Sequence, residues 1–288
     1  MTSKRVAIDF GMSNIKVAVA QPHGPPTLFS VPRQGNASVG EARRVLGGMG
    51  IAPDDVALLC VTGGQAQLLP DQFEQASVVK VSEVAAIGRG GLYLAELDEA
   101  LIVSAGSGTA MIAARSSGRD GGAESKHVTG SAVGGGTLQG LARLLIGTTD
   151  PQEINTLAEQ GDSNQVDLTL IEAAGGAIGS LPADANAVNF GKLARAGFNE
   201  QASREDLAAG LVCLVGQVIA VIAINAARAE KLDRIVVIGH LADMPSVGKV
   251  LTTVAGYYGA DIRIAPTPGY GTVLGALLHS SQPITNSQ

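Results

Sequence analysis

The first apolar segment of the chain ends in an acidic residue, and a glycine, small polar residues and a lysine follow at once. Asp9 stands at the end of the predicted strand 5–8, and Gly11, Ser13 and Lys16 come next. A strand, a tight turn and a second strand of this composition present N–H groups, a hydroxyl and an ammonium group to phosphate oxygens. Asp9 could hold Mg²⁺ through water, because Mg²⁺ keeps several waters and needs few carboxylates.

This motif also fits an ordinary hairpin with a solvent-facing carboxylate, because short motifs arise by chance. Three further glycine clusters favour a nucleotide site, although each could also be a simple tight turn. The clusters follow one another in an order that spans both halves of the chain. The predicted nucleotide contacts are Gly11, Met12, Ser13, Asn14, Ile15, Lys16, Gly106, Ser107, Gly108, Thr109, Gly135, Gly136, Thr137, Leu138, Gln139, Gly239 and His240.

Two of the later clusters lead to specific structural expectations. Residues 106–109 form a small-residue turn between apolar runs, where the backbone can approach a phosphate closely. We expect Gly108 to adopt a positive φ, and a side chain there would fill the space of the phosphate. Residues 134–136 open a helix at 137–145, and glycines at a helix start leave N–H groups free for an anion.

Composition narrows the class of protein. A chain of 288 residues with 45% apolar residues can bury one large core or two medium ones. Its 38 glycines are nearly twice the usual share of about 7%, and they fall in discrete turns. The net charge of −6 argues against a broad nucleic-acid surface.

Features tied to cell compartment are few. Cys60 and Cys213 lie in apolar runs without metal spacing, which indicates buried reduced thiols. The residues before the first strand are too few and too polar for a signal peptide. Gln217, Asn225 and Arg228 interrupt the apolar stretch around 209–227, so we expect a buried helix there and no membrane span. These features predict a cytoplasmic protein.

The order of predicted elements is that of an α/β, two-lobed, actin-like (ribonuclease H-like) ATPase fold with a nucleotide cleft between the lobes. We predict an N-terminal lobe at 1–98 and a C-terminal lobe at 99–288. Apolar alternation and turn residues predict strands at 5–8, 15–20, 27–31, 55–61, 78–81, 99–104, 110–113, 234–238 and 262–264. Predicted helices are 40–50, 82–94, 137–145, 203–232 and 270–278, together with one that begins after Asp150.

Two segments of the second lobe have surface roles in this prediction. A glycine-rich, charged hairpin tip at 116–122 should be exposed and mobile. The long helix at 203–232, capped by Ser203, is a candidate dimer contact. Packing of this helix within its own chain is an equally good alternative.

Glu83 is the candidate general base. Phosphoryl transfer needs mainly positioning and charge neutralisation, so one carboxylate near the acceptor hydroxyl suffices. Glu83 begins the helix at 82–94, where the helix dipole favours its ionised form. The alternative is a favourable first-turn acid without a catalytic role.

Taken together, the sequence resembles the type II pantothenate kinases over about residues 5–280. Residues 161–162, 166–168 and 187–192 are the specific part of this resemblance, since they are not general to the actin-like fold. The matching segments are Asp9-x-Gly11-x-Ser13-x-x-Lys16, Glu83 with Gly88 and Gly90, 106–109, 128–137, 161–162, 166–168, 187–192 and 237–239.

The resemblance implies an ATP-dependent, Mg²⁺-assisted kinase that phosphorylates the primary hydroxyl of pantothenate or a close relative such as pantetheine, the first step of coenzyme A biosynthesis. Glu83 matches the proton acceptor of the family, and Asp9 would position the metal through water. The family is dimeric. The residues implied on the acceptor side are Glu83, His127, Thr129 and Gly130.

The chain departs from the family pattern at several positions. Met12 replaces the usual second glycine of the first loop, and Ser13 replaces a threonine but keeps the hydroxyl. His127 stands where the family has an arginine that grips the pantothenate carboxylate, and histidine is a weaker, pH-dependent anion partner. Lys126 beside it could supply the charge instead.

Two alternatives stay open. One is a related kinase that acts on a different small hydroxy acid, sugar or polyol. The other is a non-catalytic nucleotide-binding regulator, against which the presence of both Asp9 and Glu83 speaks.

Overall fold

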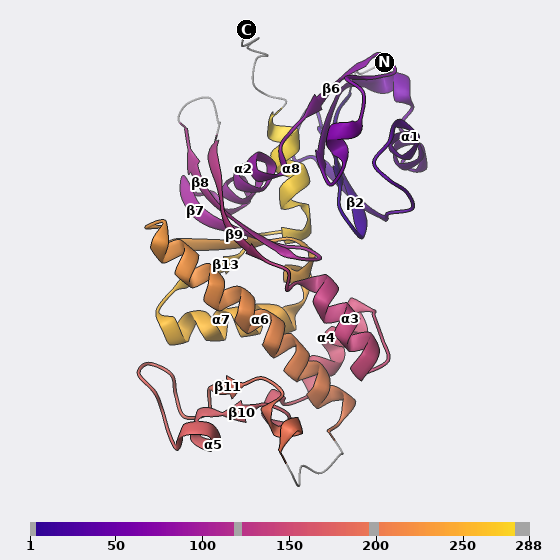
Figure 1. Cartoon of the computed structure of the whole chain (residues 1–288). Helices are drawn as coiled ribbons and strands as arrows, with labels where there is room; N and C mark the ends of the chain where they lie inside the picture. The colour runs from indigo at the N-terminus through magenta and orange to yellow at the C-terminus, as the bar shows by residue number, and fades with distance from the viewer. Residues whose placement is uncertain (1–3, 118–122, 196–201, 280–288) are drawn as a thin grey trace.

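The computed structural model describes residues 4–117, 123–195 and 202–279. It contains two large β-sheets, and helices α2 (Glu83–Ala95) and α8 (Gly271–His279) lie between them (Figure 1). The strands of the first sheet all precede residue 81, and those of the second all follow residue 98. The division at residue 98 remains a proposal, since α8 returns from the end of the chain to pack on the first sheet.

The first sheet has the strand order β3-β2-β1-β4-β6-β5. Its strands are β1 (Lys4–Phe10), β2 (Asn14–Val19), β3 (Thr27–Pro32), β4 (Val56–Gly63), β5 (Gln72–Phe73) and β6 (Ala76–Lys80). Side chains alternate across β1, as the period of a strand requires. Val6, Ile8 and Phe10 join the core under α1 (Val39–Gly48), whereas Ala7 joins the core under α8.

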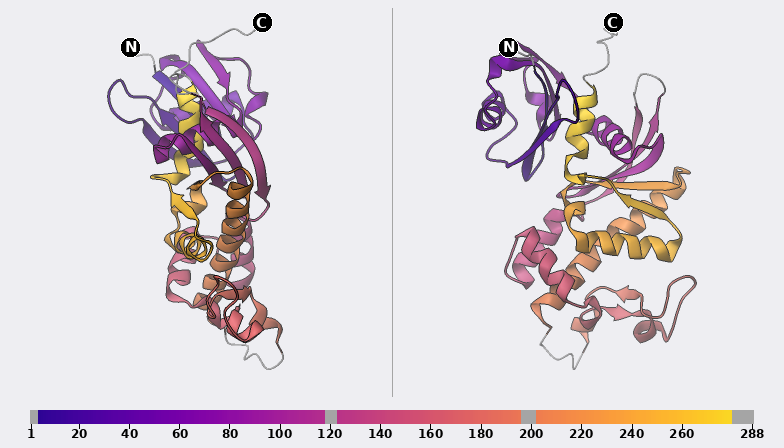
Figure 2. Two further views of the ribbon diagram at one scale, coloured as in Figure 1. Left: turned by 90° about the vertical axis from the view of Figure 1, so that its left-hand side faces the viewer. Right: turned by 180° about the vertical axis from the view of Figure 1, so that it is seen from behind.

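The second sheet has the strand order β13-β12-β7-β8-β9. Its strands are β7 (Glu99–Ala105), β8 (Thr109–Ser116), β9 (Ala123–Ser131), β12 (Arg234–Ile238) and β13 (Asp261–Ile264). Leu101 and Val103 face the core formed with α6 (Arg204–Ala229) and α7 (Pro245–Tyr258), and Ile102 faces α2. Figure 2 shows α6 and α7 on the opposite side of this sheet from α2. The sheet is therefore buried on both faces, which explains its apolar strands.

Helix α6 is the predicted long helix, and Ser203 caps it by accepting a hydrogen bond from the Asp206 N–H. Within the described residues it is the one helix long and apolar enough to cross a membrane, and 67% of its most apolar window is buried inside the fold. That burial is the behaviour of a core helix, as predicted.

A small region below the second sheet joins the segments that distinguish the family resemblance. It contains β10 (Leu168–Thr169), α5 (Leu170–Ala174) and β11 (Asn186–Val188). The buried Asp167 carboxylate accepts hydrogen bonds from the Phe190 N–H at 2.7 Å and from Asn186 Nδ2 at 2.5 Å. Burial raises the pKa of Asp167 to about 6. Segments 166–168 and 187–192 thus form one polar junction.

Several elements differ from the sequence prediction. Helix α7 was not predicted, although Pro245 at its start and buried Val247, Leu251 and Val254 have helical spacing. Strands β5, β10 and β11 were also missed, because two or three residues show no readable alternation. The tip of the predicted hairpin, residues 118–122, lies outside the described residues.

Helices α2 and α8 cross at a distance that only glycine allows. A Cβ atom at Gly90 would overlap the Gly271 carbonyl oxygen, and one at Gly275 would overlap the Ala86 carbonyl oxygen. A Cβ at Gly91 would meet the Ile102 side chain of the second sheet. These contacts fix the position of α2, which begins at Glu83.

Candidate active site

A pocket of about 440 Å³ lies where the β1–β2 turn, the β7–β8 turn and the starts of α2 and α3 (Gly135–Leu145) meet. It brings together residues that lie up to 263 positions apart in the sequence, from Asp9 to Thr272. The predicted residues that line it are Asp9, Gly11, Met12, Ser13, Asn14, Lys16, Glu83, Gly106, Ser107, Gly108, Thr109, Gly135, Gly136, Leu138, Gln139, Gly239 and His240.

Other predicted residues are not part of this lining. The Ile15 side chain is buried in the core under α1. The Thr137 hydroxyl donates to the Ala132 carbonyl oxygen at 3.1 Å. Thr109 does line the pocket, but its hydroxyl donates to the Val133 carbonyl oxygen at 2.9 Å. His127, Thr129 and Gly130 belong to the neighbouring strand β9.

Asp9 and Lys16 form the charged centre of the first loop. They are cross-strand partners on β1 and β2, and Lys16 Nζ lies 3.5 Å from Asp9 Oδ2. Burial raises the pKa of Asp9, and the Lys16 charge opposes this only in part. Asp9 Oδ1 lies directly over Gly63, where a Cβ atom would come within 2.5 Å of it.

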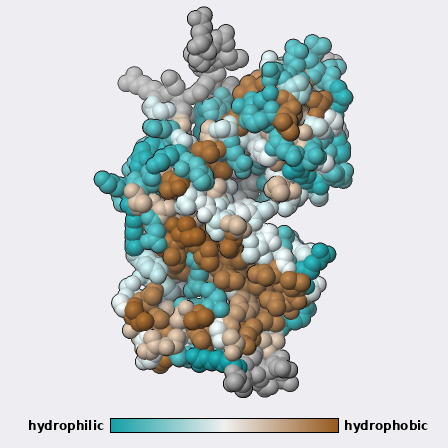
Figure 3. Space-filling model, in the orientation of Figure 1, coloured by the Kyte–Doolittle hydropathy of each residue, from teal (hydrophilic) through white to brown (hydrophobic). Residues whose placement is uncertain are grey.

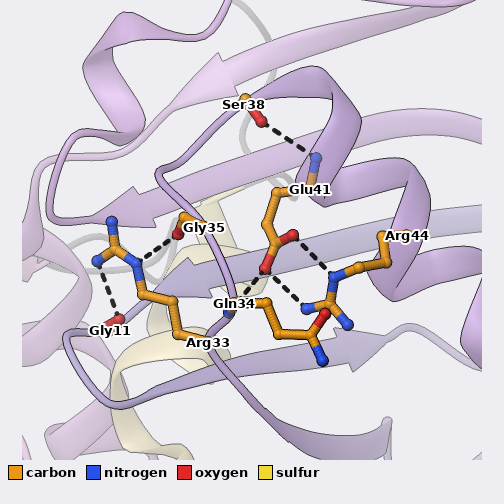
Figure 4. A network of polar contacts seen from close by, with 7 residues as sticks. All are labelled: Gly11, Arg33, Gln34, Gly35, Ser38, Glu41 and Arg44. Carbon is orange, nitrogen blue, oxygen red and sulfur yellow. Dashed lines mark hydrogen bonds and ion pairs between the residues drawn. The ribbon is translucent and has the colours of Figure 1, made fainter.

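Arg33, which was not predicted from the sequence, holds the first loop in place. Its Nη1 donates to the Gly11 carbonyl oxygen at 3.3 Å and its Nε to the Gly35 carbonyl oxygen at 2.7 Å (Figure 4). Its backbone N–H also donates to the Ser13 carbonyl oxygen at 3.0 Å. The sequence contains no local signal for this role, because the arginine simply follows strand β3.

The segment after β3 is in turn anchored to α1 by Glu41. This buried carboxylate accepts two hydrogen bonds from Arg44, at 2.7 and 2.8 Å, and one from the Gln34 N–H at 3.3 Å (Figure 4). The hydrogen bond from Arg44 keeps the pKa of Glu41 below its usual value. The ionised carboxylate therefore supports the loop that carries Gly11 and Ser13.

The two hairpin turns touch each other and leave hydrogen-bond donors unused. Ser13 Oγ and Ser107 Oγ lie 3.3 Å apart. The N–H groups of Met12, Ser13, Ser107 and Gly108 donate to no acceptor in the described part of the chain. Unused N–H groups on adjacent turns form a concave site for an anion.

The glycines that open α3 do not have the predicted role. The N–H groups of Gly135 and Gly136 donate to the carbonyl oxygens of Gly106 and Ser107, at 2.8 and 2.9 Å. A Cβ atom at Gly134 would lie 2.7 Å from the Ser107 carbonyl oxygen. These glycines therefore clamp the β7–β8 turn by close backbone contact, and the expectation of free N–H groups at Gly135 and Gly136 was wrong.

The expectation of a positive φ at Gly108 was also wrong, whereas the expectation that a side chain there would meet a bound phosphate stays a prediction. The φ of Gly108 is not in the left-handed region, and a Cβ atom there would make an ordinary contact of 3.4 Å with the Ser131 carbonyl oxygen. The strained glycine is Gly239, with φ of 98° and a Cβ position that would overlap the Ala105 carbonyl oxygen. The close approach occurs where β12 ends beside β7.

Glu83 lines the same pocket at the first residue of α2. Burial raises its pKa, and the Asp9 charge raises it further against the opposing effect of Lys16. The helix dipole alone would lower the pKa of Glu83, so the direction expected from the sequence was wrong. A carboxylate with a raised pKa is a better proton acceptor, and like charge nearby is a common cause of such a shift.

His240 faces the pocket in a fixed orientation. Its Nδ1 lies 2.7 Å from Asp243 Oδ2, and its buried Nε2 has no hydrogen-bond partner among the described residues. Gly269 packs against the imidazole ring, where a Cβ atom would clash with it. Asp243 thus holds the ring through Nδ1, while Nε2 stays buried.

The other end of the pocket is apolar. Pro151 and Ile154 from α4 (Pro151–Gln160) line it together with Leu241 and Met244. Sequence reasoning missed these residues, because they come from separate elements and no local motif joins them. Further lining residues that were not predicted are Ser104, Ala110, Ser131, Gly269 and Thr272.

Strand β9 places His127 and Gly130 on the side of the sheet that faces α2. Gly130 pairs with Ala110 and His127 pairs with Ile112, and Ala110 is itself a pocket residue. Because paired residues project to the same face, the imidazole extends the wall that Ala110 begins. Thr129 pairs with Met111, which is buried on the α6 side, so its side chain lies on the other face.

Lys126 does not supply a charge to this wall. It pairs with Ala113 on the α6 side of the sheet, and its Nζ forms an ion pair of 2.8 Å with Glu230 Oε1. The alternative that Lys126 takes over from the family arginine was therefore wrong.

Comparison with known proteins identifies the family. The Fumble family profile matches residues 99–279, more than half of the chain. The chain belongs to the Fumble family, the type II pantothenate kinases. A type II pantothenate kinase from Oceanobacillus iheyensis is 28% identical over 242 residues, covering 82% of this chain and 84% of the relative. One from Staphylococcus epidermidis is 30% identical over 191 residues, covering 65% and 69%.

Solved structures confirm the predicted fold class. The activator of 2-hydroxyisocaproyl-CoA dehydratase from Clostridium difficile, with bound ADPNP, matches with a TM-score of 0.65 at 16% identity, over 96% of this chain and 94% of the other. A ROK hexokinase from Thermus thermophilus matches with a TM-score of 0.53 at 15% identity, over 96% and 97%. The Fumble-family chain has the α/β, actin-like ATPase and sugar-kinase fold.

The contact of Gly63 with Asp9 leads to a prediction. Gly63→Ala should weaken binding of a non-hydrolysable ATP analogue with Mg²⁺ at least about tenfold, because the new methyl group displaces the Asp9 carboxylate. Gly24→Ala is the matched control, since Gly24 has a similar φ, 90° against 87°, and no atom within 4 Å of the Cβ position. Calorimetric titration measures both variants. Equal affinities would show that Gly63 does not control the site.

Proposed function

We propose that this protein is an ATP-dependent cytoplasmic kinase that phosphorylates the primary hydroxyl of pantothenate or a close relative such as pantetheine, the first step of coenzyme A biosynthesis. One observation carries the proposal. Asp9, Lys16 and Glu83 meet in one pocket with unused N–H donors from two turns. Membership of the type II pantothenate kinase family supports it.

The pocket contains suitable groups for each part of ATP. Lys16, the Ser13 and Ser107 hydroxyls and the unused N–H groups would bind the phosphates. The apolar end at Ile154, Leu241 and Met244 would bind the base. Gly135 and Gly136 at the start of α3 would not bind the phosphates through their N–H groups, because these groups already donate to the carbonyl oxygens of Gly106 and Ser107.

The donor set also fits Mg²⁺. The described residues contain no cluster of three or more His, Cys, Asp or Glu side chains, so a site made entirely of protein ligands is not available there. Mg²⁺ bound with nucleotide needs only one or two carboxylates, and Asp9 would hold it through water. When bound, the metal neutralises charge on the phosphates. The buried Asp9, with its raised pKa, gains a cation to stabilise its ionised form.

Glu83 would accept the proton of the acceptor hydroxyl. It lies at the pocket wall within the electrostatic reach of Asp9, and α2 is fixed by its glycine crossing with α8. His240, which lines the pocket and whose ring is held by Asp243, would contact the bound nucleotide. The acceptor would then lie between Glu83 and the β9 wall that carries Gly130 and His127.

Glu83→Gln tests the general base. Removal of a general base typically lowers the rate by about 10²–10⁴, so turnover should fall in that range while ATP affinity stays within a few-fold. Because the pKa of Glu83 is raised, kcat/KM of the wild type should fall on acidification at a pH above the ordinary glutamate value of 4.5.

Glu124→Gln, an exposed acid on β9, is the control and should keep wild-type turnover. Coupled ADP release measures the rates. A Glu83→Gln enzyme with more than about a tenth of wild-type turnover would contradict the assignment.

His127 favours a second candidate for the acceptor. Without a guanidinium, and with Lys126 engaged by Glu230, the β9 wall lacks a fixed positive charge for a carboxylate. An uncharged acceptor such as pantetheine, or a sugar or polyol, would not need that charge. ADP release over a panel of pantothenate, pantetheine, sugars and hydroxy acids separates these acceptors. A protein that binds ATP but turns over none of them would be the non-catalytic regulator.

His127→Arg tests the choice of acceptor. A hydrogen bond to a charged group contributes about 1.5–3 kcal/mol, so kcat/KM for pantothenate should rise about tenfold or more. The gain should be confined to acceptors that carry a carboxylate, because arginine stays charged and offers two parallel donors to that group.

Use of pantetheine should not change in this variant, and Lys126→Met should leave kcat/KM for pantothenate near the wild-type value. Equal pantothenate efficiencies of wild type and His127→Arg would mean that His127 does not face the acceptor carboxylate.

A homodimer through α6 is part of the same proposal. Leu214, Val218 and Val221 form a half-buried apolar stripe along this helix. Figure 3 shows apolar atoms gathered in a band across this face, where Figure 1 places α6. A second copy would remove this band from water. No nucleic-acid or membrane partner is expected from the net charge of −6 and the burial of α6.

Val218→Asp should convert a dimer to a monomer, because it places a charge in the middle of the stripe. Leu144→Asp is the control, since Leu144 on α3 is 80% exposed and lies on another helix. Sedimentation velocity measures the assembly state, and circular dichroism checks folding. A folded Val218→Asp protein that is still dimeric, or a monomeric wild type, would contradict the α6 interface.

A further inference from the structure

Arg89 is a buried cation without a partner among the described residues. It lies in the middle of α2, and its side chain is only 8% exposed. Within residues 4–117, 123–195 and 202–279, it makes no hydrogen bond and no ion pair, and its Nη1 atom is fully buried and unsatisfied. Buried arginines are ordinarily paired with carboxylates.

This state is energetically costly. A guanidinium cannot give up its proton in a protein, so burial leaves a charge in a poorly solvated place. Burial lowers the pKa of Arg89, and no acid of the described residues opposes that shift. The pKa of His279 is lowered as well, by its own burial and then by the Arg89 charge. Within the described residues, the Arg89 charge is therefore not neutralised by a hydrogen bond or an ion pair.

Arg89 borders a second pocket, of about 660 Å³. This pocket shares no lining residue with the one that contains Asp9 and Glu83. Its wall is mainly apolar around the guanidinium, with Leu92, Leu94, Leu97 and Leu278. Glu96 and Asp98 line it as well, beyond the last turn of α2.

We propose that this second pocket binds a small monocarboxylate with an aliphatic tail, and that Arg89 is its anchor. The planar guanidinium matches a carboxylate with two parallel hydrogen bonds. The leucine side chains fit an aliphatic tail, which gains free energy by leaving water. Glu96 and Asp98 repel a more highly charged anion, so a phosphate fits less well than a carboxylate.

The site is independent of the proposed kinase activity. It needs only the guanidinium and the apolar wall, and no nucleotide. Its test therefore uses binding and thermal stability of the full chain, and a failure here would leave the proposed function untouched.

Hexanoate is the probe, with hexanol and hexyl phosphate for comparison. Hexanoate should raise the Tm of the wild type and bind in calorimetric titration, hexanol should have no effect, and hexyl phosphate should bind several-fold more weakly. Arg89→Met should lose the response to hexanoate. Arg234→Met is the matched control, since Arg234 is an exposed arginine at the start of β12, and it should respond as the wild type does.

The stability of Arg89→Met without a ligand gives a second readout. Removal of an unpaired buried charge should leave its Tm equal to or above that of the wild type. If this variant does not fold, Arg89→Lys keeps the charge but not the paired donors, and should bind hexanoate at least tenfold more weakly. The proposal is overturned if hexanoate does not bind the wild type, if Arg89→Met or Arg89→Lys binds it equally well, or if hexanol binds as well as hexanoate.

Discussion

Close contact between backbones through glycine is the constraint on which the rest of this structure depends. At the α2–α8 crossing, a Cβ atom at Gly90 or Gly275 would overlap a carbonyl group of the opposite helix. At the pocket, Gly134 and Gly135 bring α3 against the β7–β8 turn, and Gly239 brings the end of β12 against β7. These elements approach one another so closely only because these positions have no side chain.

The contacts that hold the pocket together place charge where it is unfavourable without a ligand. Asp9 and Glu83 both have raised pKa values, mainly because of burial, and Lys16 offsets this only in part. Shifted carboxylates in one cleft are characteristic of functional sites, since structural ion pairs would instead lower the pKa. Glu41 illustrates the contrast, because Arg44 pairs with it and lowers its pKa. The same physics applies to Arg89, whose buried charge has no acid beside it in the described residues.

Some predictions from sequence failed for reasons that can be named. Residues 134–136 were expected to expose N–H groups, but a glycine signals close approach without saying whether the neighbour is a ligand or the chain itself. Lys126 and His127 are adjacent in sequence, and the pleat of β9 sends them to opposite faces of the sheet. Arg33 and the apolar end at Ile154 and Met244 carried no local motif, so nothing in the sequence pointed to them.

The sequence by itself determined the strand–turn–strand loop at Asp9 to Lys16, the start of α2 at Glu83 and the apolar strands, because these follow from local composition and alternation. It also determined the family, through motifs that run along the chain. Only the tertiary structure decided that Gly63 supports Asp9, that α3 clamps the β7–β8 turn and that Lys126 turns away from the acceptor wall. Such relations depend on distances between segments far apart in the chain, and local preferences do not encode those distances.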